Sequence, residues 1–228
     1  MTAPTAHPEE AVAARLSQVR TRIERAGGDP ESVRVVAVTK GFGPAAVSAA
    51  AAVGLVDVGE NYAQELLAKR AAPGLPAGLV WHFLGRIQTN KVRALAPAVD
   101  CFQSVSRELE GERLAAARTE ATVLVQVAFA TEGGRPGCDP AQVPALCRTL
   151  SGLGLHVAGL MAVAPRPPEE AGAAFATVRR LADDLGLAVR SMGMTEDLEL
   201  AVAHGSTMVR VGRALFGDRP ARPAASAT

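Results

Sequence analysis

The sequence predicts an α/β fold, a single (β/α)8 barrel of the TIM type with an extra helix at its N-terminus. Eight short segments are apolar almost throughout, as parallel strands covered by helices are. Stretches with helical periodicity alternate with these segments, and the connections between them are short. The chain has 228 residues, a length that one such barrel can occupy.

The first predicted element is an amphipathic helix. Apolar side chains recur at Val12, Leu16, Val19 and Ile23, a spacing that places them on one helical face. The glycine pair at 27–28 ends this pattern before the first strand.

The predicted strands are runs rich in β-branched and other apolar residues. They are Val33–Lys40, Val56–Asn61, Val80–Gly85, Cys101–Val105, Thr122–Phe129, His156–Val163, Ala188–Met194 and Thr207–Gly212. Helices are predicted between them near 44–53, 61–71, 88–96, 107–119, 140–151, 168–186 and 196–204. We expect Asp139 to be the N-cap of the helix at 140–151, with Pro140 in its first turn.

An open, doubly wound sheet is the alternative architecture. Such a sheet normally carries a glycine-rich fingerprint after its first strand, and the segment "KGFGPAA" at 40–46 does not have that spacing. The number of strand and helix units therefore favours the closed barrel.

The organisation along the chain is that of one domain. The barrel is predicted to span residues 8–217. Residues 1–7 and the tail 218–228 lack apolar periodicity and are rich in proline and alanine, so we expect both to be disordered.

Composition limits the classes of partner and the compartment. The formal net charge of +1 gives no reason to expect a nucleic acid or an acidic membrane surface as partner. The three cysteines are odd in number and lack metal-ligand spacing, which is typical of free thiols in a reducing compartment. The first residues do not read as a signal peptide, and no apolar run reaches the ~20 residues of a membrane helix. We therefore expect a cytoplasmic protein.

Polar residues gather where the predicted strands end. Alternate side chains of a strand point to opposite faces, so Lys40 lies on the same face as Val38, and Arg210 on the same face as Met208. Active sites of such barrels lie at the carboxyl ends of the strands. A lysine in this position, partly removed from water, is suited to form a Schiff base.

A second group of residues predicts an anion site across the barrel. Ser191 ends the seventh strand, and Thr195 is placed as the N-cap of the next helix. Gly212 and Arg213 follow the eighth strand, where phosphate sites of barrels are common, and the guanidinium of Arg210 requires an acceptor. Together these residues predict a phosphate-bearing ligand whose reactive carbon reaches Lys40. A sugar-phosphate aldolase and a pyridoxal phosphate protein both fit this outline.

Several segments resemble one known family. The segments "AVTKG", "GENYAQE", "WHFLGRIQTNK", "GLMAV" and "SMGMTEDLELAVAHGSTMVRVGRALFG" are similar, in order and spacing, to the YggS/PROSC family. These are pyridoxal 5′-phosphate (PLP) homeostasis proteins related to the N-terminal barrel of alanine racemase. The similarity extends from about Val33 to Gly217.

The resemblance implies specific roles for the predicted site residues. Lys40 would form the aldimine with PLP, and Asn61 would lie beside the cofactor ring. The phosphate would be held by Ser191 and Thr195 together with the backbone N–H groups of Gly212 and Arg213, while Arg210 would face the pyridine nitrogen.

The resemblance also implies limited catalysis. An arginine does not readily protonate the ring nitrogen, so carbanion chemistry would be weak. The related racemases use a tyrosine base from a second domain, whereas this chain has a single tyrosine, Tyr62, and we expect no second domain. The expected function is to hold PLP and take part in vitamin B6 homeostasis without strong turnover. A weak PLP-dependent amino-acid racemase is the alternative, and an aldolase is disfavoured.

Some positions depart from the family pattern. Thr39 precedes Lys40 and "GFG" follows it, Thr195 replaces the usual serine, and the loop after the fifth strand reads Arg135–Pro136–Gly137. His82 is compatible with a role near the site and equally with a purely structural one. The expected partners are PLP and PLP-dependent apo-enzymes, and the expected state is a monomer.

Overall fold

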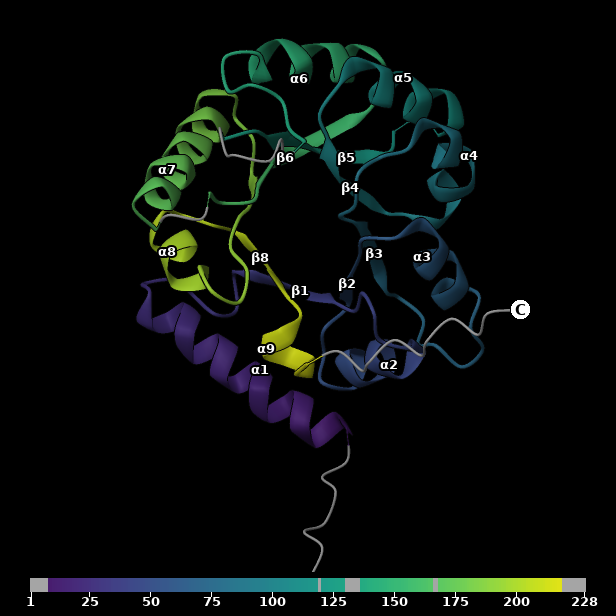
Figure 1. Ribbon diagram of the computed structural model, residues 1–228, viewed down its shortest axis with the longest axis vertical. Coiled ribbons are helices and arrows are strands. Elements are labelled where there is room, and N and C mark those ends of the chain that lie inside the picture. Colours follow the sequence, from purple (N-terminus) through teal and green to yellow (C-terminus); the bar gives the residue numbers. More distant parts are fainter. Residues whose placement is uncertain (1–7, 119, 130–135, 166–167, 219–228) are drawn as a thin grey trace, which may run out of the picture.

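The computed structural model describes residues 8–118, 120–129, 136–165 and 168–218. Within this part of the chain, eight parallel strands close into a barrel in the order β1-β2-β3-β4-β5-β6-β7-β8, with helices around it (Figure 1). The strands are β1 (Arg34–Val38), β2 (Asp57–Glu60), β3 (Val80–Phe83), β4 (Cys101–Val105), β5 (Thr122–Val127), β6 (His156–Ala162), β7 (Val189–Ser191) and β8 (Met208–Val211). The predicted barrel is confirmed. The open sheet is wrong, because β8 pairs with β1 and places Arg210 opposite Val36.

The helices form the outer layer of the described structure. They are α1 (Pro8–Arg25), α2 (Pro44–Ala52), α3 (Ala63–Arg70), α4 (Val92–Leu95), α5 (Glu108–Ala117), α6 (Val143–Gly152), α7 (Pro168–Asp184), α8 (Leu198–Ala203) and α9 (Arg213–Phe216). The extra helix α1 packs against α2, α8 and α9 on the outside of the barrel (Figure 1). The short helix α9, which directly follows β8, was not predicted.

The predicted apolar face of α1 is confirmed. Val12, Leu16, Val19 and Ile23 are all buried. Each such side chain contributes about 1.5–3 kcal/mol relative to an exposed one, so α1 is an integral part of the barrel.

The two faces of the strands have different partners. Val35 and Ala37 of β1 and Val209 of β8 pack outward in one cluster that includes the buried side chains of α1. Val38 and Arg210 lie on the opposite face and line a cavity in the barrel. The predicted orientation of these two strands is therefore confirmed.

The segment predicted as a helix at 88–96 is divided into short pieces. It consists of a 3-10 turn η1 (Thr89–Lys91), the single turn α4 and a second 3-10 turn η2 (Ala96–Ala98). Pro97 lies in the last piece and has no N–H to donate, which limits continuous α-helical hydrogen bonding there.

The predicted N-cap at Asp139 is wrong. Helix α6 begins at Val143 after Gln142. The carbonyl of Asp139 accepts the N–H groups of Gln142 and Val143, and its carboxylate accepts the N–H of Ala141 at 2.8 Å. Asp139 therefore opens a turn that leads into the helix, because its side chain bonds locally to the backbone.

Some predictions fall on residues outside the described ranges. These are the disorder of residues 1–7, the disorder of the tail 218–228 except for Asp218, and the position of Arg135. Among the described helices, none has both the length and the apolar character that crossing a bilayer requires.

Candidate functional site

A cavity of about 770 Å³ opens where the barrel strands end. Its size is within the range of small-molecule sites. Six of the seven predicted site residues line it, namely Lys40, Asn61, Thr195, Arg210, Gly212 and Arg213. The seventh, Ser191, is not among the lining residues. Segments distant in the sequence thus meet at one mouth of the barrel, as the sequence predicted.

Lys40 lies on a constrained turn directly after β1. The N–H of Phe42 donates to the carbonyl of Thr39 at 3.0 Å, and Gly41 between them has a φ of 79°, in the left-handed region that favours glycine. The N–H of Gly41 also donates to Glu65 Oε2 at 2.9 Å. The flexible side chain of Lys40 therefore starts from a fixed backbone position at the cavity wall.

A second lysine is buried directly beneath this turn. Lys69 Nζ donates to the carbonyl of Thr39 at 2.7 Å and to Glu60 Oε1 at 2.5 Å. Thr39 Oγ1 donates to the same carboxylate oxygen at 2.5 Å. Burial raises the pKa of Glu60, and the hydrogen bonds from Lys69 and Thr39 oppose that rise. Sequence reasoning missed this cluster, although Lys69 lies three residues after the buried Leu66 on α3.

Thr195 lies in a turn before α8 and is not the predicted N-cap. Helix α8 begins at Leu198, and Asp197 precedes it. The carboxylate Oδ1 of Asp197 accepts the N–H of Met194 at 2.6 Å, which closes the turn around Thr195. The boundary error is two residues, but the side chain of Thr195 still lines the cavity.

Helix α1 holds the same turn from outside. Arg22 Nη2 donates to the carbonyl of Thr195 at 2.8 Å, and Arg22 Nε forms an ion pair with Glu199 at 2.6 Å. The hydrogen bond from Arg22 lowers the pKa of Glu199. Because exposed ion pairs contribute only about 0–1 kcal/mol, the main effect of Arg22 is to position the turn. Sequence reasoning did not find this contact.

Gly212 and Arg213 form the end of the cavity after β8. A Cβ at Gly212 would lie 3.1 Å from the carbonyl oxygen of Val38, closer than side chains normally tolerate. Arg213 Nη2 lies 2.5 Å from Glu196 Oε1, and both side chains are exposed. Glycine at 212 therefore permits close packing of β8 against β1 at the cavity wall.

Arg210 is a buried cation whose side chain reaches the cavity. Its Nη1 donates to Ser191 Oγ at 2.8 Å and to the Ser191 carbonyl at 2.6 Å, and its Nη2 donates to the Ala162 carbonyl at 2.7 Å. Burial lowers the pKa of Arg210 to about 10, which leaves it charged at neutral pH. Among the described residues, no carboxylate lies within ion-pair distance of it.

Ser191 lies behind Arg210 and away from the cavity wall. Its side chain is fully buried, and its hydroxyl donates to Gln103 Oε1 at 2.7 Å. The structure therefore does not bring Ser191 together with Thr195 at the cavity surface. Its hydroxyl contacts Arg210, the residue in front of it.

Asn61 carries a polar atom that has no partner among the described residues. Its side-chain Oδ1 is buried and accepts no hydrogen bond from them. The backbone of Asn61 packs closely against Gly85, since a Cβ at Gly85 would lie 1.8 Å from the Asn61 carbonyl oxygen. Glycine at 85 thus allows the chain after β2 to approach β3.

Gln126, whose Nε2 donates to the Pro136 carbonyl at 2.6 Å, also lines the cavity and was not predicted.

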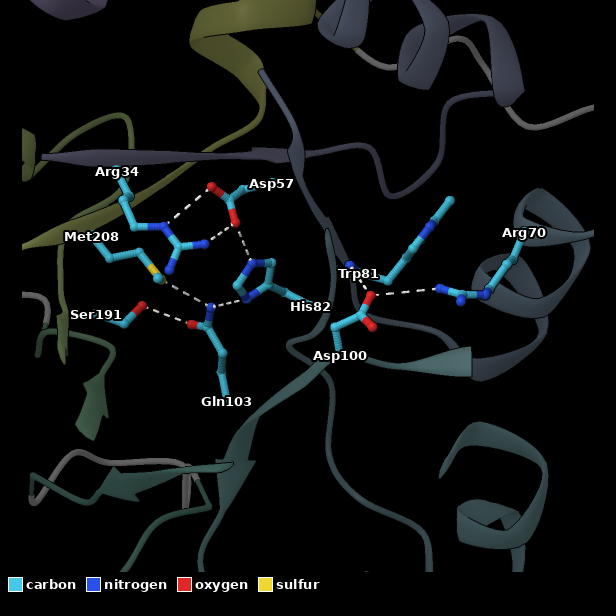
Figure 2. Close-up of polar contacts among 9 residues, drawn as sticks. All are labelled: Arg34, Asp57, Arg70, Trp81, His82, Asp100, Gln103, Ser191 and Met208. Carbon is cyan, nitrogen blue, oxygen red and sulfur yellow. Dashed lines mark hydrogen bonds and ion pairs between the residues drawn. The ribbon is translucent and has the colours of Figure 1, made fainter. Parts of the chain in front are cut away.

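His82 does not line the cavity. It is buried inside the barrel, where Nε2 lies 2.8 Å from Asp57 Oδ1 and Nδ1 lies 2.8 Å from Gln103 Nε2 (Figure 2). This arrangement favours a structural role over direct contact with a ligand in the cavity.

Comparison with known proteins gives matches over nearly the whole chain. A family model described as the N-terminal domain of alanine racemase matches residues 9–220. The pyridoxal phosphate homeostasis protein of Pseudomonas aeruginosa is 42% identical, and the match covers 92% of this chain and 95% of that protein.

Solved structures agree with this result. PipY of Synechococcus elongatus PCC7942, in a structure with PLP bound, is 36% identical with a TM-score of 0.78, over 90% of this chain and all of that one. Alanine racemase from Streptomyces coelicolor A3(2) has a TM-score of 0.73 at 24% identity, over 93% of this chain and 59% of that one, which shows a shared barrel fold.

Proposed function

The chain belongs to the family of pyridoxal phosphate homeostasis proteins, whose barrel is that of the alanine racemase N-terminal domain, and on that premise we propose that it binds and holds PLP. The observation that carries the proposal is the cavity itself. Lys40, just after β1, lines the same cavity as three residues that are suited to bind an anion, namely Thr195, Gly212 and Arg213.

The residues of the cavity fit PLP chemically. Asn61 Oδ1 is a buried acceptor that lacks a donor among the described residues. Arg210 has five N–H groups, of which three donate to Ser191 and Ala162, so two remain without a described partner. PLP has an aromatic ring with polar substituents and a phosphate. It therefore offers hydrogen-bonding groups that match the acceptor of Asn61 and the donors of Arg210.

Lys40 is proposed as the covalent attachment point. When bound, PLP supplies an aldehyde carbon, which condenses with a lysine amine and releases water. Lys40 provides that amine. Hydrogen bonds of Thr39 and Gly41 fix the backbone turn that carries it, and Lys40 lines the cavity. The buried Lys69 is paired with Glu60 and lies below this wall, so it does not compete for the aldehyde.

The phosphate is proposed to bind at the part of the cavity formed by the residues that follow β7 and β8. The hydroxyl of Thr195 and the backbone N–H groups of Gly212 and Arg213 would donate to its oxygens, and the Arg213 guanidinium adds positive charge. Ser191, predicted for the same role, would act on the ligand only through Arg210.

The character of Arg210 supports a carrier in preference to an enzyme. Arg210 stays protonated at neutral pH, so it donates a hydrogen bond and does not transfer a proton to a ring nitrogen. Without that proton, the cofactor withdraws electrons from a bound amino acid less strongly. We therefore propose PLP homeostasis without strong turnover.

A weak amino-acid racemase is the second candidate, because the barrel is shared with alanine racemase. Racemisation requires an acid or base on each face of the substrate carbon. Lys40 can serve one face. Tyr62, the only tyrosine in the sequence, is 59% exposed and is not among the residues that line the cavity.

The decisive experiment adds PLP to the purified protein and records the visible absorbance. Borohydride reduction followed by peptide mass mapping should locate the cofactor on Lys40. The variant Lys40→Ala should stay colourless, and Lys91→Ala, which changes a lysine outside the cavity wall, should behave as the wild type. A wild-type protein that remains colourless in excess PLP would refute the proposal.

Two further measurements separate the candidate functions and test the ring contact. Exchange of the substrate α-proton with solvent deuterium at enzyme-like rates would favour the racemase. Arg210→Gln should retain the bond to Lys40 but change the absorbance and the rate of cofactor release. If both stay unchanged, Arg210 does not contact the ring.

We further propose that the protein acts in the cytoplasm as a monomer that supplies PLP to apo-enzymes. The near-neutral charge and the lack of a spanning helix among the described residues agree with this assignment. Light scattering of the purified protein tests the monomer. Activation of a PLP-dependent apo-enzyme by the loaded protein, in the presence of a trap for free PLP, tests direct transfer.

A further inference from the structure

A chain of hydrogen bonds crosses the barrel interior below the cavity. It begins at Arg34, the first residue of β1, whose partly exposed guanidinium pairs with Asp57 through both Nε and Nη2 (Figure 2). The carboxylate of Asp57 also faces His82 Nε2 at 2.8 Å, and His82 Nδ1 faces Gln103 Nε2 at 2.8 Å. These side chains come from β1, β2, β3 and β4 in turn.

The chain continues to Arg210. Gln103 Oε1 accepts from the hydroxyl of Ser191 at 2.7 Å, and Ser191 Oγ accepts from Arg210 Nη1 at 2.8 Å. The amide nitrogen of Gln103 also lies 3.2 Å from Met208 Sδ, a weak acceptor. A single connected path therefore joins the opposite mouth of the barrel to the cation at the cavity.

The charge on Asp57 determines the direction of every donor in this path. Burial acts to raise the pKa of Asp57, but the hydrogen bonds from His82 and Arg34 outweigh it, so the pKa lies below its usual value. The carboxylate can then only accept, and His82 must present Nε2–H to it. The unprotonated Nδ1 of His82 in turn accepts from Gln103.

The orientation of the Gln103 amide follows from that tautomer. With its nitrogen directed at His82, its oxygen faces Ser191, whose hydroxyl must donate to it. The lone pairs of Ser191 Oγ are then left for Arg210 Nη1. A flipped amide would require Nδ1–H on His82, and in the neutral ring this would set the Nε2 lone pair against the Asp57 carboxylate.

Proton transfer along the path is ruled out by its central member. A carboxamide does not accept a proton on nitrogen and pass it on from oxygen at a useful rate, so Gln103 interrupts any relay. The path can transmit orientation and polarisation, which accumulate along connected hydrogen bonds.

We propose that Asp57, His82 and Gln103 are positioning residues for Arg210. The charge of Asp57 fixes the tautomer of His82, His82 fixes the amide of Gln103, and the amide fixes the Ser191 hydroxyl that orients the guanidinium at the cavity. The role assigned to the oriented guanidinium, contact with the ring of PLP, rests on the proposed function, whereas the orientation itself does not.

Nitrogen-15 NMR of the ligand-free protein tests the orientation directly. His82 should be neutral with the proton on Nε2, and Arg210 should show two separate Nη signals because its guanidinium is held at Ser191 and Ala162. In Gln103→Leu the Nη1 signal should shift, because the Ser191 hydroxyl loses its acceptor, while the bonds to the Ser191 and Ala162 carbonyls keep the two Nη signals separate. Gln103→Glu, which keeps an acceptor for Ser191 but cannot donate to His82, should leave the Nη1 signal near its wild-type position and add a proton to His82 Nδ1.

Cofactor release gives the second readout. We expect PLP to leave Gln103→Leu about tenfold faster than wild type, and Gln103→Glu at nearly the wild-type rate. Leu150→Ala, which removes buried volume in the outer helix α6, an element that contributes no residue to the path, should lower the melting temperature without changing the release rate or the Arg210 signals. If Gln103→Leu does not fold, Ser191→Ala removes the last link and should give a shift of the same Nη1 signal.

Each outcome decides a defined point. An Nδ1–H or doubly protonated His82 in the wild type, or an unchanged Nη1 signal in Gln103→Leu, would overturn the proposed positioning. Failure of the wild type to bind PLP would refute the proposed function, and the NMR measurements would still decide whether the path orients Arg210.

Discussion

The buried pair of Lys69 and Glu60 allows a prediction with a defined magnitude. The two groups are 2.5 Å apart, with side-chain exposures of 6% and 0%. Replacing Lys69 with methionine keeps the volume and removes the charge, which leaves Glu60 buried without its cation. Removing one partner of a buried pair typically costs about 3–5 kcal/mol.

The loss can be measured by denaturant or thermal unfolding. For a chain of this size, such a loss should lower the melting temperature by about 10 °C. In the double variant Lys69→Met with Glu60→Gln, most of the stability should return, because no unpaired charge remains and the introduced amide oxygen can still accept from Thr39 Oγ1.

The loss should also depend on pH. The pKa of Glu60 is already raised by burial, and removing Lys69 removes a contribution that opposes the rise. A carboxyl whose folded pKa exceeds its unfolded value, near 4.5, is least costly when protonated. The deficit of Lys69→Met should therefore be small below about pH 4.5 and should grow as the pH rises through the folded pKa.

Two results would refute this reasoning. A loss below about 1 kcal/mol at neutral pH would mean that Glu60 is hydrated or already neutral in the folded protein. A deficit equal at about pH 5 and about pH 8 would mean that its charge is not the cause. Lys91→Met, a change at a lysine that forms none of the ion pairs identified among the described residues, is the control for loss of a lysine alone.

Three further predictions concern the site and the thiols. Thr195→Val should weaken PLP retention by about 1.5–3 kcal/mol in a direct titration, through loss of one charge-assisted hydrogen bond, and unchanged affinity would place the phosphate elsewhere. Gly85→Ala should destabilise the fold by several kcal/mol in urea unfolding and reduce PLP binding, because the new Cβ would lie 1.8 Å from the Asn61 carbonyl oxygen. Wild-type stability of this variant would contradict that geometry. Cys101 and Cys147, whose pKa values burial raises to about 12 and about 11, should react with a thiol reagent only after unfolding, and rapid labelling of the native protein would show that they are accessible.

The barrel could be predicted from the sequence because its strands are apolar on both faces. All eight were located, and β4 was predicted with its observed ends at Cys101 and Val105. Other strands were predicted too long at the carboxyl end. Strand β7, for example, ends at Ser191 although the prediction extended to Met194. Met192 and Gly193 still form backbone hydrogen bonds with β8, whereas Met194 lines the cavity and donates its N–H to Asp197.

The membership of the cavity was also largely predictable, since strand ends of a barrel converge. The contacts of its members were not. Alternation predicts that His82 faces inward, but its partners Asp57 and Gln103 belong to neighbouring strands whose register the sequence does not specify. Ser191 was correctly placed at the end of β7. Its position behind Arg210 could not be predicted, because it too depends on the register between neighbouring strands.

The seam between β1 and β8 has a consequence for how the binding function is acquired during folding. Val36 pairs with Arg210, and these residues are about 170 positions apart in the chain, so the loop closed by this seam is almost the whole domain. A growing polypeptide that has emerged only as far as β7 already displays the amine of Lys40 but lacks the residues after β8. If PLP binds in this cavity as proposed, specific binding can begin only when β8 has docked against β1, and PLP retention then reports closure of the barrel.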